Sequence, residues 1–151
     1  MAKPLVFMMG RSPAFLPADR RYARNHMWAE AEEGGYRFGL SSYAVKLLGD
    51  VYHVQWSVAP GTEVGEGDRL GYIEASKATS DLYAPTGGRM VEFNSGVLAT
   101  PELLNTNLYD AGWLFRMAAG SESLLSAEDY LAHLETCWPL AQRLLKGQAG
   151  R

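Results

Sequence analysis

The chain has 151 residues, of which 47% are hydrophobic and 21% are charged, and its net charge is −3. The length suits one globular domain, and the weak acidity lacks the basic stripe that a nucleic-acid binder presents. No apolar run approaches the roughly 20 residues of a membrane helix or the ~7–15 residues of a signal-peptide core. We therefore expect a cytoplasmic protein without a nucleic-acid or membrane partner.

Cysteine and histidine are scarce. Cys137 is the single cysteine, which excludes an internal disulfide framework and a multi-cysteine metal site. His26, His53 and His133 lie far apart and lack the ligand spacing of a zinc site. The sequence therefore predicts no metal site.

The N-terminal segment differs from the rest of the chain. Residues 1–21 hold three prolines and little periodicity, which favours an extension that lies on the surface or is partly disordered. We place a carrier-type β-domain at 22–118 and a C-terminal helix, packed on that domain, within 119–151.

From Met27 the pattern is that of β-structure. Residues 27–40 predict a hairpin around Gly34 and Gly35. Ser41 and Ser42 can cap a short helix through Leu48, and Gly49 can end it. The next segment alternates apolar and polar residues and predicts a half-buried strand with His53 exposed; its expected buried residues are Tyr52, Val54, Trp56 and Val58.

The remaining elements follow from turns and periodicity. Strands at 69–75 and 79–83 form a hairpin whose tight turn is 76–78, and a further strand covers 89–94. A short helix starts at Pro101, and a closing strand covers 112–117. Residues 126–146 predict a helix with Ser126 at its start, kinked at Pro139; its apolar stripe is Leu131, Leu134, Trp138, Ala141 and Leu145.

The turn at 76–78 carries the candidate chemistry. Lys77 lies at its tip, and the small neighbours Ala75, Ser76 and Ala78 leave its amine open to a modifying enzyme. Glu74 and Asp81 flank the turn and can position it for recognition. A covalent cofactor arm needs such an exposed amine on a rigid platform, because the protein then orients the cofactor that does the chemistry.

The surrounding residues resemble the glycine-cleavage H-protein family. The match is widest around the lipoylation hairpin of that family, here GDRLGYIEASKATSDLYAP at 67–85. It continues over about residues 20–145, through YARNHMW at 22–28, GLSSYA at 39–44, LGD at 48–50, PELLN at 101–105, YDAGWL at 109–114 and the helix at 123–137.

This resemblance implies a fold and a cofactor. The fold is mainly β, a hybrid barrel-sandwich of the lipoyl/biotinyl type with short peripheral helices and a C-terminal helix. Lys77 would carry lipoic acid in amide linkage as a swinging arm, attached by a lipoate ligase or lipoyl transferase. Biotinyl carriers usually place methionine on both sides of the lysine, whereas this chain has Ser76 and Ala78, so biotin is disfavoured.

The cargo of the arm is the open question. In the family the arm carries an aminomethyl group from a decarboxylase to an aminomethyltransferase, and a glutamate after the motif histidine faces its charged amine. Here the motif reads His26-Met27-Trp28, and a methionine cannot balance that charge, although the acidic Asp81 is kept. His26 and Met27 become candidates for the cleft that receives the arm.

Two systems fit these residues. Methionine suits an apolar or sulfur-containing cargo, as in the H-like lipoate-binding proteins of bacterial sulfur oxidation, which work with a heterodisulfide-reductase-like complex. We expect this reading first, and an H protein of glycine cleavage in which Met27 is tolerated as the alternative.

Readings from other classes have less support. The sequence lacks the nucleophile triad, the phosphate-binding loop and the metal-ligand spacing that would indicate an enzyme. A β-sandwich interaction domain would give Lys77 no functional role. We therefore expect a non-catalytic carrier. Cys137 could act as a resolving thiol for the lipoyl disulfide, but its place beside Trp138 in the helical stripe favours a small buried hydrophobe.

Overall fold

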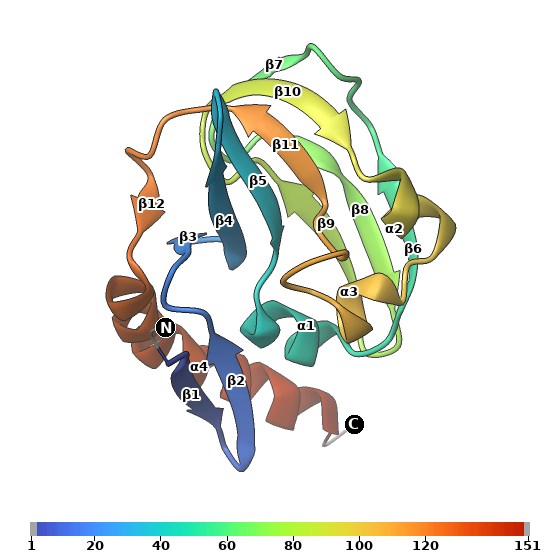
Figure 1. Ribbon diagram of the computed structural model, residues 1–151. Helices are drawn as coiled ribbons and strands as arrows, with labels where there is room; N and C mark the ends of the chain where they lie inside the picture. Colours follow the sequence, from blue (N-terminus) through green and yellow to red (C-terminus); the bar gives the residue numbers. More distant parts are fainter. Residues whose placement is uncertain (1–2, 150–151) are drawn as a thin grey trace.

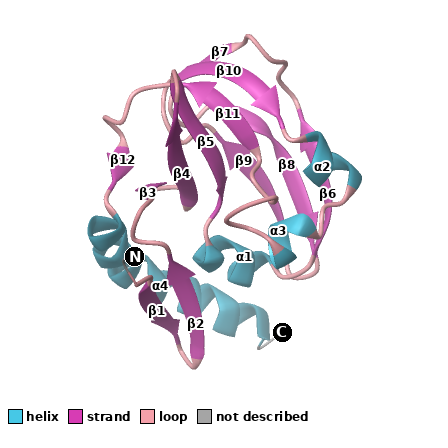
Figure 2. Ribbon diagram, in the orientation of Figure 1, coloured by secondary structure: helices cyan, strands magenta, loops and turns pink. Residues whose placement is uncertain are grey.

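The computed structural model describes residues 3–149, with side chains through residue 143, and consists of β-sheets flanked by helices (Figures 1 and 2). A seven-stranded sheet has the order β12-β3-β4-β5-β11-β10-β7, and a three-stranded sheet has the order β6-β8-β9. The strands of the larger sheet are Arg21–Ala23 (β3), Met27–Glu32 (β4), Gly35–Leu40 (β5), Glu63–Val64 (β7), Gly88–Phe93 (β10), Phe115–Ala118 (β11) and Leu124–Leu125 (β12). Those of the smaller sheet are Val51–Trp56 (β6), Arg69–Ala75 (β8) and Thr79–Tyr83 (β9).

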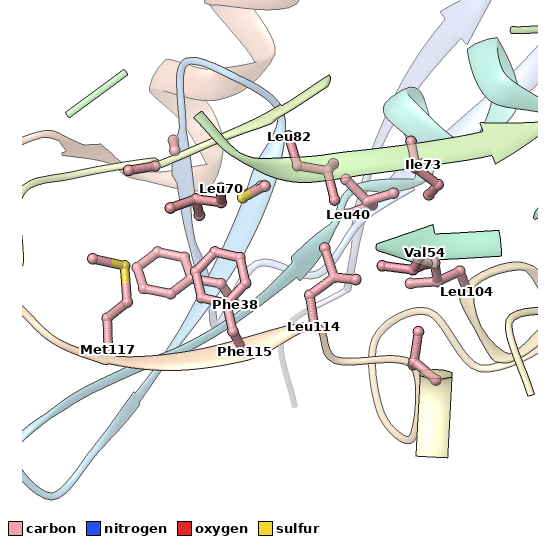
Figure 3. Packing of buried hydrophobic residues seen from close by; sticks show 14 of the residues in the cluster. Phe38, Leu40, Val54, Leu70, Ile73, Leu82, Leu104, Leu114, Phe115 and Met117 are labelled. Carbon is pink, nitrogen blue, oxygen red and sulfur yellow. The ribbon is translucent and has the colours of Figure 1, made fainter. Parts of the chain in front are cut away.

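The main core lies between these two sheets. Phe38 and Phe115 stack from neighbouring strands of the larger sheet, with ring centroids 5.5 Å apart. They lie in one buried cluster with residues of the smaller sheet (Figure 3), among them Val54, Leu70 and Ile73. Burial of so many apolar side chains is the dominant stabilising contribution. The mainly β sandwich expected from the sequence is confirmed.

Short helices close the ends of the sheets. Helix α1 (Ser42–Leu48) begins at the N-cap Ser41, whose hydroxyl accepts the Ala44 N–H, and ends at Gly49, as predicted. Two short helices, α2 (Ser95–Ala99) and α3 (Leu103–Thr106), precede β11. The sequence predicts α3 near Pro101, whereas α2, capped by the Asn94 side chain, was not anticipated.

The N-terminal segment forms a β-hairpin, which the expectation of a surface-lying or partly disordered extension did not anticipate. Strands β1 (Leu5–Met9) and β2 (Ser12–Leu16) pair antiparallel around Gly10, which has φ +64°. Figure 1 shows this hairpin beside α1 and α4 (Ala127–Ala149). The alternation is masked in the sequence because exposed positions such as Val6 and Met8 are also apolar.

A second core joins this hairpin to the C-terminal helix. Its buried residues include Phe7 and Leu16 of the hairpin, Trp28 of β4 and Tyr130 and Leu134 of α4. Leu131 and Trp138 of the predicted stripe pack against it, whereas Leu145 lies outside the described side chains. The helix therefore packs on the rest of the chain, and the Asp129 N–H donates to Ser126 Oγ at its start (3.1 Å).

The strand at β6 departs from the predicted alternation. Tyr52, expected inside, is 63% exposed. A register shift between Val51 and His53 opposite β8 reverses the side that Tyr52 faces. His53 is exposed as expected. Within residues 3–149, no helix combines the length and hydropathy needed to span a bilayer.

Candidate lysine site and its cleft

Lys77 lies at the tip of the β8–β9 hairpin, as the sequence predicts. The Ala75 N–H donates to the Ala78 carbonyl (3.0 Å) and closes a four-residue turn with Ser76 and Lys77 at its centre. The Lys77 side chain is exposed, and its Nζ donates to the Lys46 carbonyl (3.2 Å). The amine is therefore reachable from solvent while its backbone is fixed.

Hydrogen bonds hold the tip of this hairpin against the end of α1. The Lys77 N–H donates to the Leu48 carbonyl (2.9 Å), and the Ser76 N–H donates to the Asp50 carbonyl (2.8 Å). Ser76 Oγ accepts the Asp50 N–H in return (2.9 Å). The small Ser76 therefore does more than leave space, because its hydroxyl helps to fix the lysine on a rigid platform.

Asn105 of α3 supports the same platform. Its Nδ2 donates to the Gly49 carbonyl (2.8 Å), and its Oδ1 accepts the Val51 N–H (2.9 Å). Both groups flank Asp50, which bonds to Ser76. The hairpin, the end of α1 and the short helix α3 thus form one hydrogen-bonded unit.

Position 49 requires glycine, because both its backbone conformation and the space beside the β8–β9 hairpin exclude a Cβ atom. Its φ of +81° and ψ of −152° are unfavourable for any residue with a Cβ, and a Cβ there would collide with Ser76 Oγ and approach Lys77 Cγ to 3.0 Å. Gly61 has a similar φ of +90° but open space around it, so it provides a matched control.

We expect Gly49→Ala to lower the free energy of unfolding by more than Gly61→Ala does. Backbone strain should cost about 1–3 kcal/mol in both variants, and only the Gly49 variant adds the collision with the hairpin. Urea unfolding measures the change in the free energy of unfolding. The rate of enzymatic lipoylation at Lys77 measures whether the collision displaces the hairpin. Equal lipoylation rates in the two variants would show that the Gly49 contact does not position the lysine.

The two acidic residues of the predicted recognition turn have different surroundings. Glu74 is exposed and lies opposite Thr79 in the β8–β9 register. Asp81 pairs with Arg69, with Oδ1 3.0 Å from Nε, and both side chains are about half exposed at 44% and 46%. The charge of Asp81 is therefore already partly balanced, although it lines the neighbouring cleft.

A cleft of about 310 Å³ lies beside the hairpin. Ala78 and Asp81 line it on the hairpin side, and His26 and Met27 line it on the side of β4. Most other lining residues are apolar: Leu40, Ala44, Leu47, Leu48, Ile73 and Leu82. The structure thus brings His26, Met27 and Asp81 to one cleft.

Met27 makes part of this cleft apolar. It is only 1% exposed, belongs to the main core and lies opposite Leu40 in the β4–β5 register. A thioether at this position offers neither charge nor a strong hydrogen-bond acceptor. The cleft therefore favours hydrocarbon or sulfur over a cation at this point.

His26 occupies a turn with a positive φ of 76°. Its N–H donates to the Ala23 carbonyl (3.0 Å), and its carbonyl accepts the Ser41 N–H (2.9 Å). Its Nδ1 hydrogen-bonds Tyr130 Oη at 2.9 Å. Burial, with a smaller effect of His133, lowers the pKa of His26 to about 4, so its imidazole is neutral near pH 7.

A second cleft, of about 370 Å³, also adjoins the lysine. Lys77 itself lines it, together with Val45 and Lys46 of α1, Met9 of the N-terminal hairpin and Trp138 of α4. Residues of α1 line both clefts, so this helix lies between them. The N-terminal hairpin thus contributes to the surface on which the lysine lies.

Comparison with known proteins identifies the family. The family model described as glycine cleavage H-protein matches residues 20–137. The chain belongs to the glycine cleavage H-protein family. The H protein of Alcanivorax borkumensis is 38% identical over 80% of this chain and 97% of its own length. The H protein of Listeria monocytogenes serotype 4b is 40% identical over 76% of this chain and 94% of its own length.

A solved structure agrees with this assignment. The crystal structure of the Mycobacterium marinum glycine cleavage system H protein matches with a TM-score of 0.69 and 36% identity, and the match covers 78% of this chain and 97% of that one. H proteins are non-catalytic carriers with lipoamide attached covalently to a lysine. The expected family, fold class, carrier role and cofactor are therefore confirmed.

The chain has the features that a lipoyl group needs. Lys77 presents an exposed primary amine on a clamped turn, and acylation would leave an N–H able to donate to the Lys46 carbonyl. The largely apolar cleft suits a short hydrocarbon chain that ends in sulfur. The site residues present therefore fit the cofactor.

One group of side chains was not predicted from the sequence. His133 and Cys137 of α4 lie beside His26, with Cys137 Sγ 3.4 Å from His133 Nε2. Cys137 is half-buried and contacts a polar group, so the expectation of a simple buried hydrophobe was wrong. The spacing of four residues on a helix places His133 and Cys137 on one face, which was the available signal.

Proposed function

We propose that this protein is the lipoyl carrier of a glycine cleavage system, with lipoic acid attached to Lys77. The exposed amine on a clamped hairpin beside an apolar cleft supports this assignment, as do relatives named glycine cleavage system H protein. Those names favour this alternative over the sulfur-carrier reading that the sequence put first.

Each part of the site has a role in this function. The lipoyl group supplies a dithiolane that accepts and releases cargo. Ser76, Asp50 and Leu48 hold the turn that bears Lys77, so a ligase or transferase meets a fixed shape with Glu74 exposed and Ala78 leaving room. The cleft lined by Met27 and Leu82 would shield the arm from water, and Asp81 is the one carboxylate among the residues that line this cleft.

The partner enzymes provide the direct test. The lipoylated protein, mixed with a glycine decarboxylase and carboxyl-labelled glycine, is expected to support release of labelled carbon dioxide. The same protein before lipoylation should release only the background amount. If the lipoylated protein gives no more than the unlipoylated protein, while a bacterial H protein works in the same assay, the glycine-cleavage assignment is wrong.

A second candidate function rests on Met27. Its buried thioether in an apolar cleft, together with the Arg69 partner of Asp81, suits a sulfur cargo handled by a heterodisulfide-reductase-like complex. Lipoylation at Lys77 is common to both candidates. The cargo alone separates them, and the Met27 variants described in the Discussion test it.

A further inference from the structure

Three potential metal ligands meet where the β3–β4 turn packs on α4. His26 comes from the turn, while His133 and Cys137 come from one face of the helix. One donor atom from each residue lies within 4.8 Å of the other two. His26 is more than 100 positions from His133 and Cys137 in the chain, so the docking of α4 brings it to them.

The spacing of these donors is close to that of a coordination sphere. Zinc bonds of about 2.0–2.1 Å to nitrogen and about 2.3 Å to sulfur place neighbouring tetrahedral donors about 3.5 Å apart. Cys137 Sγ and His133 Nε2 are 3.4 Å apart. His26 needs only a small side-chain adjustment to reach the same spacing, because the whole cluster spans 4.8 Å.

The second nitrogen of His26 has the support typical of a metal ligand. Nδ1 hydrogen-bonds Tyr130 Oη (2.9 Å), which in turn hydrogen-bonds Ser41 Oγ (2.9 Å). When Nδ1 donates its proton to Tyr130, the Nε2 lone pair is free to bind a metal.

We propose that His26, His133 and Cys137 form a binding site for one transition-metal cation of the Zn²⁺ class. Two imidazoles and a thiolate suit zinc, copper(I) or cobalt(II), whereas magnesium and calcium prefer oxygen ligands. All three residues are half-buried, so an ion can enter from solvent. Three protein ligands leave a coordination position for water or for another small ligand.

Binding changes two contacts at the site. The Cys137 thiol releases its proton to solvent as the sulfur–metal bond forms. His133 Nε2, which lies 3.2 Å from the Arg24 carbonyl, exchanges that contact for the metal. The proposal is independent of the glycine-cleavage assignment, because neither lipoic acid nor a partner enzyme contributes a ligand.

Zn²⁺ titration of the unlipoylated, tag-free chain tests the site. After treatment with a chelator, the protein is titrated with Zn²⁺ in competition with a chromophoric chelator, and we expect one ion per chain. Loss of a residue that hydrogen-bonds a metal ligand typically weakens metal binding about 10–100-fold. Tyr130→Phe keeps the aromatic ring but removes the hydroxyl that bonds His26, so it should weaken Zn²⁺ binding by about this factor. Cys137→Ser and His133→Asn should weaken binding at least as much.

Co²⁺ binding and a matched histidine variant test whether the metal binds at these three residues. The Co²⁺ complex should show a sulfur-to-metal charge-transfer band that Cys137→Ser lacks. His53→Ala removes an exposed histidine outside the cluster and should bind like wild type, and circular dichroism verifies that each variant is folded. Absence of stoichiometric zinc binding, or binding that Cys137→Ser and His133→Asn leave unchanged, would overturn the proposal.

Discussion

Lys77→Arg is expected to abolish enzymatic lipoylation, the largest effect of any substitution considered. Arginine keeps the positive charge at the exposed tip, and the backbone hydrogen bonds from Ser76 to Asp50 and from Lys77 to Leu48 do not depend on the side chain. The fold should persist, but a guanidinium does not provide the primary amine that is acylated. Intact-mass analysis after incubation with lipoate, ATP and a lipoate ligase should show one lipoyl addition on wild type and none on the variant.

The chain offers a close control for this experiment. Lys46 lies beside Lys77 and contributes only its backbone carbonyl to the Lys77 amine. Lys46→Arg should therefore be lipoylated at the wild-type rate. Lipoyl addition to Lys77→Arg would reject Lys77 as the single attachment site, and loss of modification in Lys46→Arg would point to Lys46.

Local patterns were sufficient to predict much of this site. The β8–β9 hairpin was predictable because two short strands flank a turn of small residues, and Lys77 lies at the centre of that turn. Ser41 and Gly49 likewise mark the ends of α1 through capping chemistry that acts within a few residues. Such features depend on residues that are close together in the sequence, so they can be predicted from the sequence alone.

Features that depend on distant contacts were not predicted. The N-terminal hairpin is held by packing on Trp28 and Tyr130, and its apolar outer face hides the alternation of a strand. The meeting of His26 with His133 and Cys137 depends on how α4 docks. The partial neutralisation of Asp81 by Arg69 depends on a cross-strand contact between β8 and β9.

Met27 tests which cargo the cleft favours. An aminomethyl cargo brings a positive charge, and a charge-assisted hydrogen bond to a carboxylate contributes about 1.5–3 kcal/mol. Methionine cannot supply this bond, and Asp81 already shares its charge with Arg69. The wild-type cleft should therefore hold a charged cargo roughly ten- to a hundredfold less well than a cleft with a carboxylate at residue 27.

The Met27→Gln variant separates the effect of a negative charge at residue 27 on cargo retention from the destabilisation caused by burying a polar side chain. Residue 27 is 1% exposed, so any polar side chain loses hydration there and destabilises the fold. Glutamine carries this cost with nearly the shape of glutamate but without its charge. Thermal unfolding of both variants measures the shared cost, and any difference in cargo retention then reports the charge.

Met27→Glu is expected to prolong retention of aminomethyl cargo by about ten- to a hundredfold, while Met27→Gln behaves like wild type. Each lipoylated protein is loaded with the cargo, and its loss is followed as release of ammonia and formaldehyde. Lipoylation should be equal in all three proteins, because Met27 lies in the cleft and makes no contact that clamps the hairpin tip. If wild type retains the cargo as long as Met27→Glu does, the methionine is no obstacle to glycine cleavage. The sulfur-cargo candidate then loses the observation on which it rests.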